Sequence, residues 1–140
     1  MPLTGKNALV TGGSRGIGFQ ISKIFLENGA NVLAVSRDSS KLAQAKDALP
    51  DLHILQGDVS IAVDNDRIAA WVQGNWGMLD ILVNNAGISP ADSGALLNLP
   101  DEAFDQTIRV NVLSPYLCTK RLLPLLLKSE DPRIVNVGSG

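Results

Sequence analysis

Short apolar runs alternate with longer segments of helical period along the whole chain. Five of these runs are rich in β-branched residues and nearly free of polar interruptions, at 7–11, 31–36, 53–56, 79–84 and 133–137. Runs of this kind are typical of strands that a parallel sheet buries on both faces. Between them, apolar positions three and four residues apart predict helices at 16–28, 39–48, 61–75 and 101–128.

This alternation predicts an α/β fold. Right-handed crossovers favour a doubly wound, Rossmann-like parallel sheet of five strands in the order 3-2-1-4-5. We therefore expect residues 1–140 to form a single domain, truncated after its fifth strand and incomplete at its C-terminal end. That strand would lie at an unpaired edge of the sheet. Pro115 falls within the last helix and should kink or split it.

The composition narrows the class of protein. Of 140 residues, 45% are hydrophobic, which suits one core of ordinary domain size. The net charge is -2 and the basic residues are scattered, so we expect a small-molecule partner, with neither nucleic acid nor a membrane. The single cysteine and the absence of a signal-peptide core indicate a soluble, cytoplasmic protein. One histidine and one cysteine at unrelated positions supply no metal-ligand set.

A glycine-rich segment, TGGSRGIG at 11–18, connects the first predicted strand to the first predicted helix. Gly12, Gly16 and Gly18 remove side chains where the turn is tight and where a pyrophosphate must approach backbone N–H groups. A tight strand-to-helix turn without a ligand would also explain the glycines. The flanking strand and helix favour dinucleotide binding.

The end of the second strand indicates which dinucleotide is bound. An acidic residue there accepts hydrogen bonds from the ribose 2′-hydroxyl group of NAD, whereas an arginine accommodates the 2′-phosphate of NADP. Here Ser36 is followed by Arg37 and Asp38, and Arg15 in the glycine loop adds a second cation. The two arginines favour NADP(H) over NAD(H). Two alternatives remain: Asp38 takes the acceptor role if the strand ends one residue later, or Arg37 is a solvated residue that starts the next helix.

With these motifs in place, the chain resembles the N-terminal, cofactor-binding half of a classical short-chain dehydrogenase/reductase. Its glycine loop is similar to the T-G-x-x-x-G-x-G pattern of that family. Gly57-Asp58-Val59 resembles the segment with the adenine-binding aspartate, and NNAG at 84–87 resembles the signature of the fourth strand. Asn111, in a VNV context, resembles the active-site asparagine, and IVNVGS places the active-site serine at Ser139.

The resemblance implies an NAD(P)-dependent oxidoreductase that acts on a carbonyl or alcohol substrate. In this family a tyrosine is the acid and base, a lysine lowers the pKa of the tyrosine, a serine binds the carbonyl oxygen and an asparagine holds a relay water. Asn111 and Ser139 match two of these catalytic roles, although Asn111 could be a polar group at a helix kink, Ser139 an ordinary strand-end serine, and NNAG mainly structural. Motifs and resemblance together give the expected cofactor-binding residues: Gly12, Ser14, Arg15, Gly16, Ile17, Gly18, Ser36, Arg37, Asp58, Val59, Asn85, Ala86 and Gly87.

Tyr116 and Lys120 have the spacing of the catalytic pair of the family, and Tyr116 is the only tyrosine. On a regular helix Tyr116 points about 140° away from Asn111, so the two side chains do not serve one site. Tyr116 instead continues a stripe of Phe104, Ile108 and Val112, four residues apart, which predicts a packing face. The family also places its pair after the serine strand. We interpret the spacing as coincidence and expect the 140-residue chain to lack the catalytic tyrosine and lysine and to be inactive alone.

Three functions are compatible with the sequence. The chain is the cofactor-binding half of an NADP(H)-dependent oxidoreductase, a non-catalytic dinucleotide-binding module, or an interaction protein that pairs its open sheet edge with another chain. Apolar residues at 104–127 and the edge strand at 133–137 predict a homo-oligomer. The face expected to be uncovered includes Leu113, Leu117, Leu122, Leu123, Leu125 and Leu126.

Overall fold

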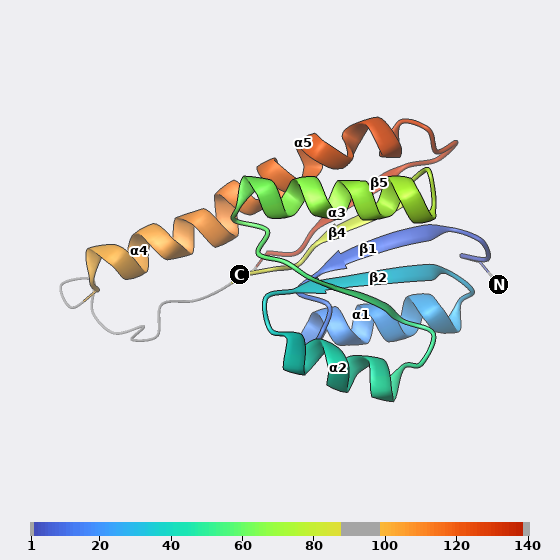
Figure 1. Ribbon diagram of the computed structural model, residues 1–140, viewed down its shortest axis with the longest axis horizontal. Coiled ribbons are helices and arrows are strands. Elements are labelled where there is room, and N and C mark those ends of the chain that lie inside the picture. Colours follow the sequence, from blue (N-terminus) through green and yellow to red (C-terminus); the bar gives the residue numbers. More distant parts are fainter. Residues whose placement is uncertain (1, 88–98, 139–140) are drawn as a thin grey trace.

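The computed structural model describes residues 2–87 and 99–138. Its centre is a five-stranded sheet in the order β3-β2-β1-β4-β5, and all four strand pairs are parallel, as the sequence predicts. The sheet lies between two helical layers, with α1 and α2 on one face and α3 and α5 on the other (Figure 1). The strands are β1 (Asn7–Thr11), β2 (Asn31–Ser36), β3 (His53–Gln56), β4 (Ile81–Asn84) and β5 (Arg133–Asn136).

Two of the strands are shorter than expected. Leu79 and Asp80 precede β4. The backbone N–H of Leu79 donates to the carbonyl of Leu125 in α5, whereas that of Asp80 still donates to the carbonyl of Asn7 in β1. Val137 follows β5, although its N–H still donates to the carbonyl of Asn84 at 3.0 Å. The first three strands have the expected bounds.

Alternate side chains of the strands build two cores. On one face, Leu9 and Leu33 pack with residues of α3 (Ala62–Asn75) and α5 (Ser114–Leu126). On the other face, Ala8 and Val32 pack with residues of α1 (Gly16–Glu27) and α2 (Ser39–Ala48). Burial on both faces is typical of central parallel strands. Because the strands pair in parallel, the carboxyl ends of β1, β2, β3 and β4 lie at one edge of the sheet.

The last predicted helix contains three segments. They are α4 (Asp101–Ile108), a π-helical turn η2 (Arg109–Leu113) and α5. Ser114 closes the π turn, because its backbone N–H and its hydroxyl group both donate to the carbonyl of Arg109, five residues earlier. Pro115 follows in the first turn of α5, where its missing N–H is tolerated. The expected kink at Pro115 is therefore a change of helix type just before it.

The apolar stripe is exposed. Phe104, Ile108, Val112 and Tyr116 are between 42% and 61% exposed, so the predicted packing face is largely uncovered within the described part of the chain. Phe104 and Ile108 belong to α4, which projects past the sheet with no other described element beneath it (Figure 1), and Val112 and Tyr116 are exposed on η2 and α5. By contrast, Leu122, Leu125 and Leu126, expected on the uncovered face, are buried in the core beside α3. None of the described helices is long and apolar enough to cross a lipid bilayer.

Candidate functional site

A cleft opens at the carboxyl ends of the strands, where ligands bind in open α/β sheets. Its first hollow has a volume of about 310 Å³ and is walled by the glycine loop, the ends of β2 and β3, and the segment after β4. The lining residues are Gly12, Ser14, Arg15, Gly16, Val35, Ser36, Arg37, Gly57, Asp58, Val59, Asn85, Ala86, Gly87 and Val110. Eleven of the thirteen expected cofactor-binding residues are among them, all except Ile17 and Gly18.

The glycine loop is shaped for close approach to a ligand. Gly16 has φ +57°, a left-handed conformation that other residues adopt only with strain. A side chain at Gly18 would overlap the carbonyl of Gly12, so this glycine lets the loop fold back on the helix. Helix α1 begins here without an acidic residue in its first turn, so its N-terminal N–H groups and the positive end of its dipole suit an anion.

Thr11 joins the glycine loop to the segment after β4. Its hydroxyl oxygen accepts hydrogen bonds from the backbone N–H groups of Asn85 and Ala86, both at 3.0 Å. The side-chain amide of Asn85 donates to the carbonyl of Gly12 at 3.2 Å. Thr11 is 2% exposed, so these bonds hold two walls of the hollow together from beneath.

The position where β2 ends decides whether Arg37 or Asp38 directly follows the strand. Strand β2 ends at Ser36, and the carboxylate of Asp38 accepts from the backbone N–H of Lys41 as the N-cap of α2. Asp38 does not line the hollow, whereas Arg37 and Arg15 do. The Ser14 hydroxyl group donates to that of Ser36 at 3.2 Å, which links the glycine loop to β2.

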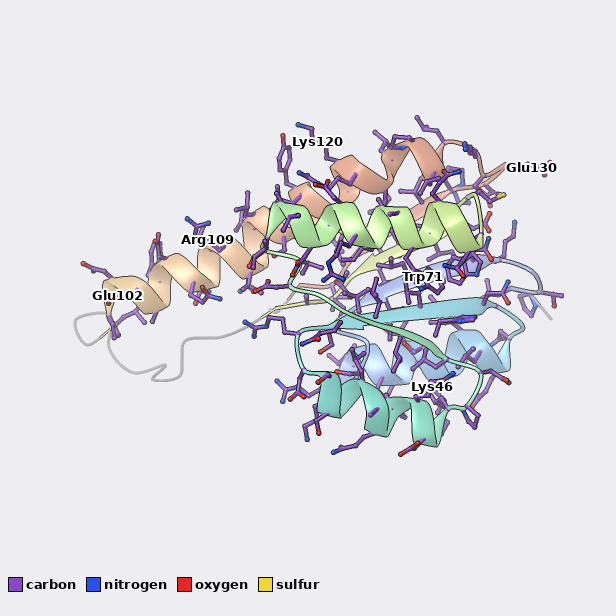
Figure 2. All side chains as sticks on the ribbon, in the orientation of Figure 1. Lys46, Trp71, Glu102, Arg109, Lys120 and Glu130 are labelled. Carbon is purple, nitrogen blue, oxygen red and sulfur yellow. The ribbon has the colours of Figure 1, made fainter. Side chains whose placement is uncertain are left out.

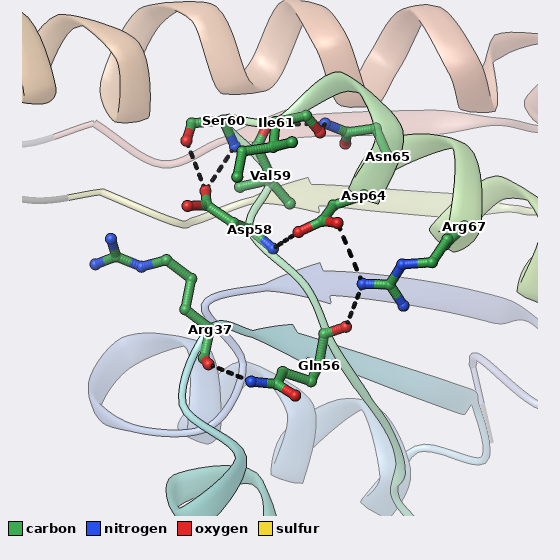
Figure 3. Close-up of polar contacts among 9 residues, drawn as sticks. All are labelled: Arg37, Gln56, Asp58, Val59, Ser60, Ile61, Asp64, Asn65 and Arg67. Atoms are coloured by element: carbon green, nitrogen blue, oxygen red, sulfur yellow. Dashed lines mark hydrogen bonds and ion pairs between the residues drawn. The ribbon is translucent and has the colours of Figure 1, made fainter.

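Asp58 lies on the opposite wall, after β3. Its Oδ1 atom accepts from the backbone N–H and the hydroxyl group of Ser60, and its own N–H donates to the carboxylate of Asp64 at 2.8 Å (Figure 3). Within the described part of the chain, the Oδ2 atom of Asp58 has no hydrogen-bond partner. One carboxylate oxygen is therefore held by the turn while the other can accept from a ligand.

A second hollow of about 480 Å³ adjoins the first and shares Asn85, Ala86 and Gly87 with it. Ile17 and Asn111 line this hollow, and Asn111 lies so close to Gly87 that a side chain there would be 3.3 Å from the Asn111 Oδ1 atom. Ser139, the other expected catalytic residue, lies outside the described residues. The structure therefore brings Asn111 to the predicted site and leaves Ser139 untested.

The Tyr116–Lys120 pair lies elsewhere. The Lys120 ammonium donates to the Tyr116 hydroxyl at 3.3 Å, both residues are exposed, and Lys120 lies on the outer side of α5 (Figure 2). Tyr116 lines a shallow groove with Ile108 and Val112, whereas Asn111 lines the second hollow. The prediction that Tyr116 and Asn111 serve different faces is confirmed, even though η2 makes the helix irregular.

Sequence reasoning missed several polar contacts of the cleft. The Asn84 side chain donates to the Asn136 Oδ1 atom at 2.9 Å and to the Thr119 hydroxyl oxygen at 3.3 Å, and both asparagines line the second hollow. Asn84 and Asn136 are register partners on neighbouring strands. Both asparagines stand near the ends of predicted neighbouring strands, and this pattern could have predicted their contact.

Nearly the whole chain is similar in sequence to known proteins. The family described as short chain dehydrogenase matches residues 6–140. The chain is 40% identical over 144 residues to the rhamnolipids biosynthesis 3-oxoacyl-(acyl-carrier-protein) reductase of Pseudomonas aeruginosa, covering 98% of this chain and 56% of that protein. It is 36% identical over 141 residues to the D-beta-hydroxybutyrate dehydrogenase of Cupriavidus necator, covering 98% and 54% respectively.

Solved structures agree with the sequence relatives. The Pseudomonas aeruginosa RhlG/NADP active-site complex superposes with a TM-score of 0.89 at 38% identity, over 98% of this chain and 56% of the other. A short-chain dehydrogenase from Streptomyces avermitilis gives a TM-score of 0.87 at 30% identity, over 97% and 50%. The chain spans about half the length of these relatives.

Proposed function

Because this chain belongs to the short-chain dehydrogenase family, we propose that it is the NADP(H)-binding part of an oxidoreductase that acts on a carbonyl or alcohol substrate. The observation that carries the proposal is the placement of Arg15 and Arg37 in the lining of one hollow, beside the glycine loop. Guanidinium groups form strong, charge-assisted hydrogen bonds with phosphate oxygens. A nucleotide with a 2′-phosphate fits that pair of charges better than one with a free ribose.

The residues of the first hollow fit the adenosine and pyrophosphate of such a cofactor. The N-terminus of α1 and the glycine loop would hold the pyrophosphate, and Gly18 lets that loop fold back on the helix start. The Oδ2 atom of Asp58 would accept from the adenine amino group. Asp38, as the cap of α2, is withdrawn from the role of ribose acceptor that NAD(H) would favour.

The second hollow would take the nicotinamide and the substrate. The cofactor, when bound, supplies or accepts a hydride there. Asn111, at the hollow beside Gly87, would orient a water for proton transfer, and Ser139 would donate to the substrate oxygen. The role of Asn111 rests on the resemblance and on its place in the hollow, and that of Ser139 rests on the resemblance alone.

Calorimetric titration with NADP⁺ and NAD⁺ tests the choice of cofactor. Arg37→Asp should weaken NADP⁺ binding by about 1.5 to 3 kcal/mol, the usual worth of a hydrogen bond to a charged group, and leave NAD⁺ binding unchanged or improved. Lys23→Asp removes an exposed cation of α1 that does not line the hollow and is the matched control. Equal losses for both cofactors would contradict the assignment.

A polypeptide of these 140 residues should bind NADP(H) without turnover. Its only tyrosine is Tyr116, which lies on the outer face of α5 away from Asn111, so no positioned acid serves the second hollow. General acid catalysis alone is typically worth about 10² to 10⁴-fold in rate. NADPH absorbance followed with a panel of aldehydes and ketones should stay at background. Activity that Tyr116→Phe abolishes would show that Tyr116 is catalytic after all.

We also propose that the chain forms a homo-oligomer through the exposed stripe Phe104, Ile108, Val112 and Tyr116. Ile108, Val112 and Tyr116 line a groove of about 450 Å³ that also includes Asp105 and Arg109, and Phe104 is exposed one turn before it. If the helices of two copies cross antiparallel about a two-fold axis, Asp105 of each copy can meet Arg109 of the other. In that arrangement the stripe is self-complementary in charge, as an isologous interface requires.

Charge exchange tests this interface by light scattering. Asp105→Lys should shift the chain toward the monomer, because it sets like charges opposite each other. Asp105→Lys combined with Arg109→Asp should restore the oligomer. A wild-type monomer at micromolar concentration, or a double variant that stays monomeric, would contradict the proposed interface.

A further inference from the structure

Arg37 is held by a residue of the neighbouring strand. The side-chain amide of Gln56, the last residue of β3, donates to the backbone carbonyl of Arg37 at 3.1 Å (Figure 3). The backbone ladder between β2 and β3 ends with the pair Ser36 and Gln56. The Gln56 side chain therefore extends the hydrogen bonding of the sheet by one residue, to the arginine on which the proposed cofactor choice depends.

Gln56 is itself fixed from α3. The Arg67 Nη2 atom donates to the backbone carbonyl of Gln56 at 3.0 Å and pairs with the Asp64 carboxylate at 3.3 Å. The other oxygen of Asp64 accepts from the backbone N–H of Asp58 at 2.8 Å. A chain of contacts through Asp64, Arg67 and Gln56 thus links the Asp58 wall of the first hollow to the Arg37 wall (Figure 3).

The bond from Gln56 to the Arg37 carbonyl affects the Arg37 side chain because both belong to the same residue. Fixing the Arg37 carbonyl fixes the peptide plane between Arg37 and Asp38, and the N-cap bond of Asp38 fixes the next residue. Only the side-chain torsions of Arg37 remain to be ordered when a phosphate binds. A group positioned in advance loses less conformational entropy on binding.

We propose that Gln56 is a specificity-positioning residue: by holding the Arg37 backbone, it strengthens binding of nucleotides that carry a 2′-phosphate. The proposal rests on the proposed function, since it requires Arg37 to contact that phosphate. Gln56 does not line the hollow, so its effect reaches the ligand through Arg37. Arg67 and Asp64 support it by holding Gln56 and Asp58 in place.

The test compares two probes, adenosine 2′,5′-bisphosphate and adenosine 5′-monophosphate, by calorimetry on the full chain. Gln56→Met keeps the length of the side chain and removes the donor. We expect it to weaken binding of the bisphosphate roughly 2- to 10-fold, as expected for the loss of one neutral hydrogen bond, and to change binding of the monophosphate less than 2-fold. Gln73→Met, at an exposed glutamine of α3, is the matched control and should change neither.

A double-mutant cycle separates positioning from general loosening. In an Arg37→Ala background, Gln56→Met should have no further effect on bisphosphate affinity. Unchanged binding by Gln56→Met, equal losses for both probes, or an undiminished effect in the Arg37→Ala background would each overturn the proposal. An Arg37→Ala variant that keeps the wild-type preference for the bisphosphate would overturn the proposed cofactor choice as well, so the two failures are distinguishable.

Discussion

Replacing Thr11 with valine should destabilise the fold and disturb the cleft together. The two side chains have nearly the same shape, so the change removes the hydroxyl group and little else. That oxygen accepts from the N–H groups of Asn85 and Ala86, and its proton is directed to the carbonyl of Val83 at 3.4 Å. The substitution therefore leaves two backbone donors without their acceptor at a site where Thr11 is 2% exposed.

The magnitude follows from those two donors. A buried donor that loses its acceptor costs about 1 to 3 kcal/mol, and the lower half of that range applies here because both N–H groups are only partly buried. We expect the free energy of unfolding to fall by about 2 to 4 kcal/mol, a large part of the total stability of a domain of this size. Nucleotide affinity should fall as well, because the segment after β4 is no longer anchored to the glycine loop.

Urea unfolding followed by tryptophan fluorescence measures the change in stability. Thr11→Ser keeps the hydroxyl group and should recover most of the loss. Thr107→Val is the matched control: its hydroxyl donates to the Ala103 carbonyl within α4, so its removal leaves no donor behind and should change stability by about 0.5 kcal/mol or less. A loss below about 1 kcal/mol for Thr11→Val, or no recovery with serine, would refute the anchoring role.

Three further predictions concern buried or partly buried groups. Burial raises the pKa of Cys118 to about 12, and Arg121 offsets part of the effect. A thiol reagent at pH 8 should therefore label the native chain only as fast as it unfolds. Rapid labelling of the native chain would contradict the burial of Cys118. Burial, and to a smaller extent the charge of Lys46, lower the pKa of His53 below 6.5, so between the folded and unfolded pKa values the unfolded chain binds more protons. The free energy of unfolding should therefore fall as the pH drops below 6.5. His53→Gln should remove that slope in urea unfolding. Ser22 in α1 is fully buried, and its hydroxyl has no hydrogen-bond partner among the described residues. Ser22→Ala should therefore raise the free energy of unfolding by about 0.5 to 1 kcal/mol. A lower free energy of unfolding in the variant would contradict this prediction.

The sequence predicts the sheet well because the apolar runs of β1 and β2 are buried on both faces and stop where the burial stops, while β3 keeps its expected bounds at the half-exposed edge of the sheet. It does not predict η2. The π turn depends on the Ser114 hydroxyl group bonding to the Arg109 carbonyl, and a serine before a proline is equally common at an ordinary helix start. The stripe that begins at Phe104 was predicted as a packing face, but periodicity shows only that a face is apolar and does not show which chain covers it.

Within the site, local motifs were enough for the glycine loop and for Arg37, because each lies in a short connection whose geometry is set by the elements beside it. Contacts between distant segments were not predictable in the same way. Gln56 and Arg37 are 19 residues apart and meet only because β2 and β3 are paired in one register. Asn84 and Asn136 are 52 residues apart and depend likewise on the pairing of β4 with β5.

The π turn also affects the geometry of the exposed stripe. In a regular α-helix a step of four residues advances about 40° beyond a full turn, so a row of side chains at every fourth position winds slowly around the helix. A π turn holds more residues than an α turn and removes much of that advance. Because η2 lies between Ile108 and Tyr116, the row from Phe104 to Tyr116 runs nearly parallel to the helix axis. A row of that kind can contact a straight partner helix along its whole length, without the supercoiling that a winding row would impose.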